Sequence, residues 1–447
     1  MAPRFRTERD IPEVTPGPSA PRGALSWAFY DFANTIFSMN VLTMYLAQWV
    51  VVDRGVEDVW YSVAYSVSMA LVALTLPVLG ALADFKAGGR LRFLLGFTIA
   101  SVAGTALIGL AARNVPGSGA VTAALFAFGI ANYAFQGSLV FYNALLPQVS
   151  TPATIGRVSG FGVALGYLGA IAGLLLVSPF VDGKLPFTDI QLPWPPAGGR
   201  AAAFYPTAFF FAVFALPLFL RVRVDGAGGS AAGGEGNPWR RAIRETWNAL
   251  RDTRRYPGVR RFLLANYLFV DAINTVIIFM AVYAQEVMGM PDTVKIQFFI
   301  VATTGAVIGS LLLGRLSDRW GHRRVLMAVL CGWAVALSIV ALSQNKGLFW
   351  VAGILVGICL GGTWTSSRAL LAALTPAESH GRFFGLYALS DKAAAVVGPL
   401  VWGLIVWVGK PLGPLRYRLA VASLVLFVLA GLALLRTVPE PAEAKAA

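Results

Sequence analysis

The chain has 447 residues, of which 57% are hydrophobic and only 13% are charged, and its mean hydropathy is +0.67. A soluble domain carries about a quarter charged residues, so this composition excludes an ordinary soluble fold and indicates surfaces that face lipid. The net charge of +14 does not by itself indicate nucleic-acid binding, because basic residues of membrane proteins collect in cytoplasmic loops.

The N-terminal segment differs from the rest of the chain. Residues 1–22 are polar and contain Arg4, Arg6, Arg9 and Arg22, without the short apolar core of a signal peptide. We expect residues 1–24 and 437–447 to be cytoplasmic tails.

Apolar stretches long enough to cross a bilayer follow. About 20 apolar residues are needed for one crossing, and the qualifying stretches are 25–52, 61–83, 91–112, 119–143, 158–180, 202–220, 261–285, 295–316, 324–343, 348–374, 384–408 and 417–436. The sequence therefore predicts an all-α membrane protein with twelve transmembrane helices. They form two six-helix bundles, over residues 25–220 and 261–436.

Residues 221–260 separate the two bundles and form a predicted cytoplasmic linker. Its first part is glycine-rich, which is typical of a flexible connection. In its second part, Trp239, Ile243, Trp247 and Leu250 recur at helical spacing among arginines. This pattern predicts an amphipathic helix on an anionic membrane surface.

The distribution of basic residues predicts the orientation. With both termini in the cytoplasm, 25 of the 36 Lys and Arg residues fall in cytoplasmic segments, nine fall in outer loops and two fall within spans. This bias places both termini inside the cell. We expect the plasma (inner) membrane because the sequence carries no organelle address.

Three short patterns occur once in each half, in the same order. Their matched copies are Asp31-Phe-Ala-Asn34-Thr35 with Asp271-Ala-Ile-Asn274-Thr275, Gly80-Ala-Leu-Ala-Asp84 with Gly314-Arg-Leu-Ser-Asp318, and the segment around Gly156-Arg157 with that around Gly381-Arg382. Since both copies start inside, they predict a parallel duplication of a six-helix unit.

These motifs also carry a family resemblance. Gly314-Arg-Leu-Ser-Asp318-Arg319-Trp-Gly321-His-Arg323-Arg324 resembles the signature loop of the major facilitator superfamily. Trp27-Ala-Phe-Tyr30-Asp31-Phe-Ala-Asn34 and the loop ending Gly156-Arg157-Val-Ser-Gly160 resemble the vacuolar amino-acid effluxer (autophagy-related) branch and its bacterial relatives. The resemblance implies that the third helix of each triplet is peripheral. The polar spans one, four (with Gln136 and Asn143), seven, ten and eleven would then line a cavity.

Charged and polar residues within spans are the candidate transport residues, because a charge in the bilayer core needs a partner or water. Asp31, Asn34 and Thr35 share one helix face, and Asp271, Asn274 and Thr275 repeat that face in span seven. These two polar helix faces, here called stripes, could face each other across the translocation path, with a carboxyl binding a substrate amine or a proton. Alternatively, the two Asp residues could be structural hydrogen-bond acceptors that close a gate.

A second group of charges lies in spans ten and eleven. Arg368 and Asp391 lie at similar depth and could form an ion pair, or Arg368 could bind a substrate carboxylate through its planar fork. Lys392 points about 100° away from Asp391 on the same helix, so we expect it to have another partner.

The motif loops are the candidate gates. Each loop carries an acid near arginines, Asp84 near Arg90 and Asp318 near Arg319 and Arg323. Such an acid could pair with a neighbouring helix N-terminus in one conformation and release it in the other. In the family that the sequence resembles, this clamp favours the outward-open state. The candidate gating residues are Gly80, Asp84, Arg90, Arg157, Gly314, Asp318, Arg319, Gly321, Arg323 and Arg382.

The predicted function is secondary active transport of a small solute by a monomer, and the finer hypothesis is proton-coupled efflux of a neutral amino acid. Sugars or drugs are alternative substrates, and a transporter-like sensor or receptor is an alternative class. No P-loop, metal motif or nucleophile–base pair indicates a pump, a cofactor or an enzyme. We expect a small-molecule substrate and the lipid bilayer as partners, and no nucleic acid.

Overall fold

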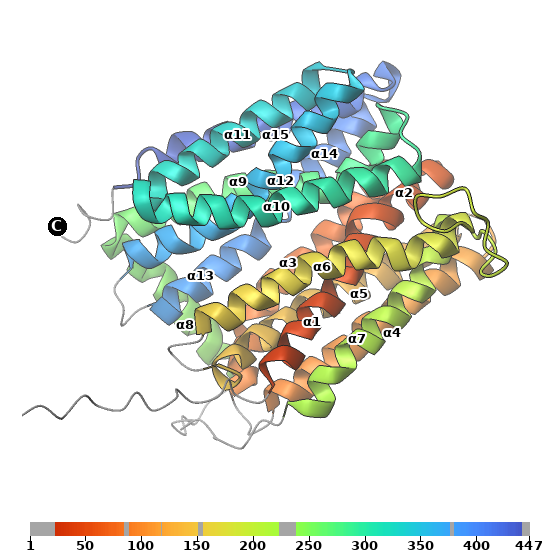
Figure 1. The fold of residues 1–447 in the computed structure, drawn as a ribbon. Coiled ribbons are helices and arrows are strands. Elements are labelled where there is room, and N and C mark those ends of the chain that lie inside the picture. Colours follow the sequence, from red (N-terminus) through yellow and green to blue (C-terminus); the bar gives the residue numbers. More distant parts are fainter. Residues whose placement is uncertain are drawn as a thin grey trace, which may run out of the picture.

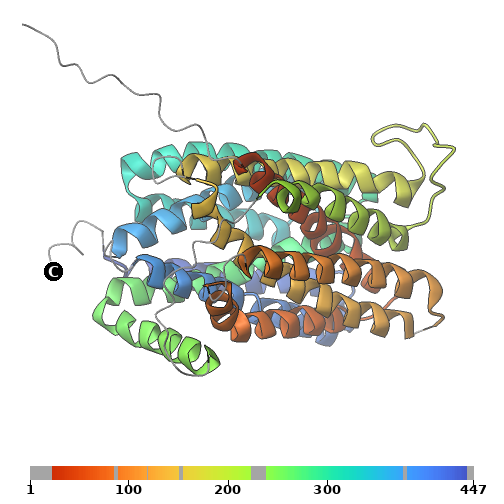
Figure 2. The same cartoon turned by 90° about the horizontal axis from the view of Figure 1, so that it is seen from below.

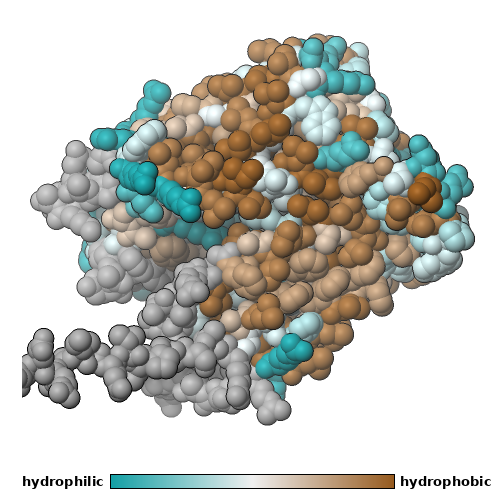
Figure 3. Space-filling model, viewed as in Figure 1, coloured by the Kyte–Doolittle hydropathy of each residue, from teal (hydrophilic) through white to brown (hydrophobic). Residues whose placement is uncertain are grey.

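The computed structural model describes residues 23–84, 89–117, 119–150, 155–222, 238–375 and 380–439. Within these ranges, twelve helical segments are long and apolar enough to span a membrane, and the only β-structure is an isolated bridge between Lys184 and Gln191. A broad apolar surface lies between two more polar ends (Figure 3). The prediction of an all-α membrane fold is confirmed.

The N-terminal half supplies the first six spans. The first span is composite: it begins as α1 (Ala24–Phe37) and continues through a π-helix (Ser38–Tyr45), α2 (Leu46–Gln48) and a second π-helix (Trp49–Asp53). The next five spans are α3 (Asp58–Asp84), α4 (Gly89–Asn114), α5 (Gly119–Leu145), α6 (Ile155–Asp182) and α7 (Phe204–Arg221). A 3-10 turn (Arg200–Ala203) precedes α7.

The C-terminal half supplies the other six. They are α9 (Pro257–Glu286), α10 (Asp292–Trp320), α11 (His322–Leu342), α12 (Lys346–Leu374), the pair α13 (His380–Ala393) and α14 (Val397–Val408), and α15 (Leu415–Leu435). The amphipathic segment forms α8 (Pro238–Asp252), whose Ile243, Trp247 and Leu250 are exposed.

Helix packing repeats between the halves, which form two bundles side by side (Figure 1). In the first half, α1 packs on α6 and α7, and α5 packs on α3 and α4. In the second half, α9 packs on α15 and on α13–α14, and α12 packs on α10 and α11. Between the halves, α3 meets α14 and α6 meets α10. Each pair has its counterpart six spans along, which is the arrangement that a parallel duplication predicts.

The two ends of the molecule are distinct. At one end, here called the terminal end, the described chain begins at Gly23 beside Val222 and finishes at Pro439 beside Gly258. The opposite end, called the far end, carries the loop over residues 183–199. Helix α8 lies at the terminal end, away from that loop (Figure 2), and packs on α3 and α13.

Two spans differ from the continuous helices that the sequence predicts. The eleventh breaks at residues 394–396, where Asp271 of α9 accepts a hydrogen bond from the backbone N–H of Gly398 at 2.8 Å. A Cβ on Gly398 would lie 2.3 Å from Thr275 Oγ1, so glycine permits this close approach. The first span changes to π-helix from Ser38 onwards.

Candidate functional site

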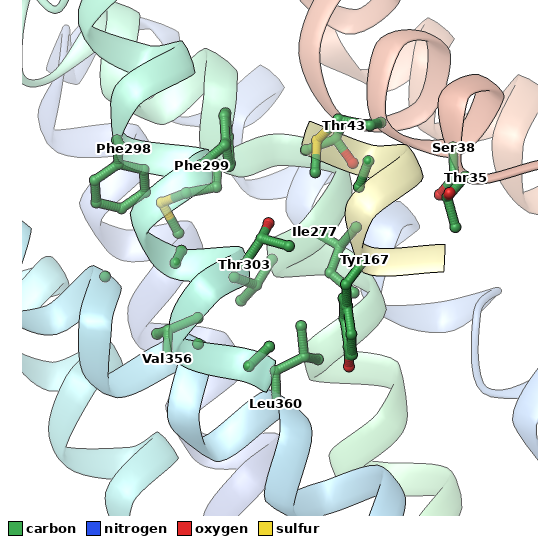
Figure 4. Close-up of a pocket in the computed structure, with 18 of the residues that line it drawn as sticks. Thr35, Ser38, Thr43, Tyr167, Ile277, Phe298, Phe299, Thr303, Val356 and Leu360 are labelled. Carbon is green, nitrogen blue, oxygen red and sulfur yellow. The ribbon is translucent and has the colours of Figure 1, made fainter. Parts of the chain in front are cut away.

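A cavity of about 280 Å³ lies between the two halves. Hydroxyl groups of Thr35, Ser38 and Thr43 reach it from the first span, and Tyr167 reaches it from α6. On the opposite side, Phe298, Thr303 and Leu360 belong to α10 and α12, and most of this wall is apolar (Figure 4). The cavity can therefore hold a small solute that has one polar end and one apolar end.

The π-helix of the first span shapes the polar wall. π-helices close their hydrogen bonds over five residues and often occur at functional sites. Ser38 and Thr43 are five residues apart within this segment, and both line the cavity. Hydropathy does not distinguish a π-helix from an α-helix, so the sequence showed only the apolar span.

The spans that line this cavity differ from those predicted. Spans one, seven and ten contribute, as expected, but spans four and eleven do not. The remaining wall comes from α6, α10 and α11. Trp333 and Val340 of α11 belong to the wall although span nine was expected to be peripheral. The lining spans were predicted from their polar residues, whereas most of the cavity wall is apolar.

Asp31 lies at the terminal-end mouth of the cavity, one turn before Thr35. Its Oδ1 accepts a hydrogen bond from Asn34 Nδ2 at 3.1 Å, and it interacts electrostatically with Arg368 of the other half. Tyr167 lies within the electrostatic reach of both groups. Thr35 donates to the carbonyl oxygen of Gly166 at 2.7 Å, which fixes this face of α1 against α6.

Arg368 is exposed, and no hydrogen bond or ion pair joins its guanidinium to another side chain in the part of the chain that the structure describes. It lies eight residues beyond the cavity residue Leu360 on α12, or about 12 Å along the helix. Asp31 therefore lines the cavity, whereas Arg368 of the other half lies beyond the lining residues, within electrostatic reach of Asp31.

Asp271 has a different environment from Asp31. It is completely buried, its Oδ1 holds the Gly398 N–H, and it is absent from the cavity wall. Thr275 donates to the carbonyl oxygen of Asp271 at 2.7 Å within α9, and Asn274 is partly buried. Of the two predicted stripes, only the one in the first span reaches the cavity.

Asp391 and Lys392 each have a partner that the sequence did not predict. Asp391 accepts a hydrogen bond from Asn266 Nδ2 at 3.1 Å, and its interaction with Arg368 is electrostatic at longer range rather than an ion pair. Lys392 donates to Gln136 Oε1 at 2.8 Å. Because Gln136 belongs to α5, this bond joins the two halves.

A cluster at the far end closes the space beyond the cavity, and we call it the far-end network. It joins Gln48, Asp53 and Arg200 of the first half to Gln285, Asp292 and Lys295 of the second half. Arg200 binds both carboxylate oxygens of Asp292, at 3.0 and 2.9 Å, and also contacts Asp53.

Lys295 is a completely buried member of the far-end network. Its side chain is 0% exposed and contacts Asp292 at 2.7 Å, Gln285 Oε1 at 2.7 Å, and Gln48. Lys295 lies one helical turn before the cavity residues Phe298 and Phe299. The network therefore closes the far side of the cavity. It is absent from the sequence-based predictions, because these assign Arg200 and Lys295 to the outer loops.

The signature loop at the terminal end leaves its acidic residue Asp318 exposed. Asp318 and Arg319 are exposed, and neither forms a hydrogen bond or an ion pair with a described residue. Gly321, with φ of 93°, makes the turn into α11. Arg323 donates to the carbonyl oxygen of Arg436 at 2.6 Å.

Other candidate gating residues have fixed or undescribed positions. Gly314 packs near Thr365, and Arg90 donates to the carbonyl oxygen of Ala144 at 3.0 Å. Asn143 is exposed near the same end of α5. The surroundings of Gly80 and the side chains of Asp84, Arg157 and Arg382 lie outside the described part.

Known proteins share this sequence and fold. The model of the family described as "Vacuole effluxer Atg22 like" matches residues 59–447. The MFS-type transporter YxiO of Bacillus subtilis is 26% identical over 426 residues, which cover 93% of this chain and 94% of YxiO. Autophagy-related protein 22 of Saccharomyces cerevisiae is 22% identical over 430 residues, with 84% of this chain and 72% of the yeast protein covered.

Solved structures agree on the fold. A mutant form of the nucleoside transporter NupG superposes with a TM-score of 0.73 at 14% identity, with 93% of this chain and 99% of that chain covered. A bacterial homolog of the human lysosomal transporter Spinster, in an inward-facing and occupied conformation, gives 0.70 at 15% identity, with 93% and 96% covered. The family match extends over most of the chain, which therefore belongs to the Atg22-like vacuole effluxer family and is a membrane transporter of the major facilitator type.

Proposed function

We propose that this transporter moves a neutral amino acid with an apolar side chain by alternating access. The observation that carries the proposal is that Asp31 lies on the cavity wall and interacts electrostatically with the Arg368 guanidinium of the other half. A carboxylate suits the substrate ammonium group, and a guanidinium fork suits its carboxylate. The apolar wall beside Leu360 then receives the side chain.

The size of the cavity supports a small substrate. Drug-sized ligands occupy pockets of about 300–1,000 Å³, whereas this cavity holds about 280 Å³. A single amino acid suits this volume better than an oligosaccharide or a large drug. The name of the family, vacuole effluxer, supports export as the direction.

Asp31 is also the proposed proton carrier. A carboxyl that holds the substrate ammonium in one state and a proton in the other couples the two movements, since the two cations compete for one site. Transport would then be an exchange of substrate for protons. In this proposal both termini are cytoplasmic and the molecule lies in the plasma membrane as a monomer, so the far-end network closes the outer side.

Counterflow in proteoliposomes tests the proposal. Vesicles would be loaded with one unlabelled neutral amino acid at a time, and entry of the labelled form would be followed without any ion gradient. We expect accumulation with leucine-like substrates, and a weakened signal that needs higher leucine concentrations in Asp31→Asn and Arg368→Gln. Full counterflow in Asp31→Asn would contradict its role in binding the amine.

The other outcomes separate the rival functions. Accumulation of a sugar or drug alone would replace the proposed substrate. Failure of amino acids, sugars and drugs in folded protein would contradict transport of these solutes and favour a sensor.

A further inference from the structure

Two connected depressions run along the outer surface of the N-terminal half. One, of about 820 Å³, lies between α3 and α5, and the other, of about 500 Å³, lies between α4 and α5. They share Ile130 and Tyr133 and therefore form one trough, called here the α5 groove. The groove belongs neither to the central cavity nor to the far-end network.

Two glycines keep the α5 groove open. A Cβ added at Gly96 of α4, or at Gly129 of α5, would meet nothing within 4 Å. Both residues line the groove, where a larger side chain would occupy its volume. The hydroxyl of Tyr133 donates to Thr75 Oγ1 at 3.1 Å, which satisfies this polar group at the junction of the two depressions. The rest of the wall is mainly apolar, as a hydrocarbon chain requires.

The terminal-end opening of the groove is basic. Arg92 lines it, is exposed, and makes no hydrogen bond or ion pair with the residues that the structure describes. It lies in the first turn of α4, near the membrane boundary. Helix α8 packs on α3 at the same end and exposes Arg240, Arg244 and Arg251. Guanidinium groups at this depth attract the phosphates of anionic lipids.

From these contacts we propose that the α5 groove is a binding site for one anionic phospholipid. Its phosphate lies against Arg92, and one acyl chain runs over Gly96 towards Tyr133 and Gly129. The distance from Arg92 to Ala100 is about 12 Å along α4, which is close to the depth of one leaflet, about half of a 30 Å core. An acyl chain of the terminal-end leaflet therefore has the length to fill the segment beside α4.

Native mass spectrometry tests the site. The full chain would be reconstituted in vesicles of equal phosphatidylglycerol and phosphatidylethanolamine, released into mild detergent, and weighed with its retained lipids. We expect one phosphatidylglycerol on the unmodified chain, several-fold in excess of phosphatidylethanolamine. Arg92→Gln should remove the preference for phosphatidylglycerol, whereas Gly96→Leu should lower retention of both lipids.

Two matched variants serve as controls. Arg113→Gln removes an exposed arginine at the other end of α4, and Gly385→Leu adds the same side chain at another open helical glycine. Both should retain lipid as the unmodified chain does. Equal retention of the two lipids by the unmodified chain would overturn the anionic assignment. Unchanged retention in folded Gly96→Leu would overturn the groove as the site.

Discussion

Removing the Arg200 guanidinium should open the far end. Arg200 makes a two-point contact with Asp292 and touches Asp53, so Arg200→Gln leaves Asp53 without this cation and Asp292 with Lys295 alone. Truncating one partner of a buried hydrogen-bonded charge pair costs about 2–5 kcal/mol. Arg200 and Asp292 are each 12% exposed, so we take the lower part of this range, about 2–4 kcal/mol.

That free energy acts on the conformational equilibrium, because the far-end network joins the two halves only while the far end is closed. At 1.4 kcal/mol for each factor of ten, the loss shifts the population towards the open far end by roughly 30- to 1,000-fold. If the closed state is populated about 100-fold more than the open state in the unmodified chain, the variant would populate both states, or mainly the open one.

Electron–electron distance measurements would detect this shift. Spin labels would be placed at Asn114→Cys and Lys346→Cys, two exposed far-end positions in opposite halves, after replacement of Cys331 and Cys359. Arg200→Gln should add a longer distance component. Arg113→Gln, which removes an exposed arginine of the same half and end, should not. An unchanged distance distribution in a folded Arg200→Gln protein would refute the role of the network as a lock.

Two further predictions concern buried polar groups. Gln136→Leu should lower the free energy of unfolding by about 1–3 kcal/mol because Lys392 loses its hydrogen-bond acceptor. The double variant Gln136→Leu with Lys392→Met should recover part of that loss. Equal losses in the single and double variants would contradict the pairing. Asp271→Ala should cost about 1–3 kcal/mol through the unpaired Gly398 N–H, whereas Asp271→Asn keeps an acceptor and should cost less. Calorimetric unfolding in detergent checks both, and a harmless Asp271→Ala would contradict the structural role of Asp271.

The number of spans and the duplication could be read from sequence because each depends on local patterns. Twelve apolar stretches are sufficient to specify twelve helices in lipid, and the paired motifs around Asp31 and Asp271 indicate the repeat. The motifs could not distinguish the environments of the two acids. Asp31 reaches the cavity, whereas Asp271 caps the broken helix of another span. This difference depends on tertiary contacts.

Cross-half pairs were the least predictable feature. Arg200 and Lys295 lie at predicted helix ends, where basic residues are common, so nothing local indicates burial. One available signal was the presence of Asp53 and Asp292 at the same predicted end, since these acids can pair with those cations. The break between α13 and α14 lies in the apolar run around residues 393–397, where hydropathy predicts an uninterrupted helix.

The proposed transport depends most on the claim that Asp31 holds an ammonium group while Arg368 holds a carboxylate. Inhibition of leucine counterflow by isoamylamine and by 4-methylvalerate, which each lack one charged group, tests this claim directly. The unmodified chain should prefer leucine over both by about 10- to 150-fold, the equivalent of one charged hydrogen bond of about 1.5–3 kcal/mol.

Arg368→Gln should remove the preference for leucine over the amine alone, and Asp31→Asn should remove the preference for leucine over the acid alone. If both variants instead weaken all three ligands equally, the two side chains do not divide the substrate between them, and the assignment of this site is wrong.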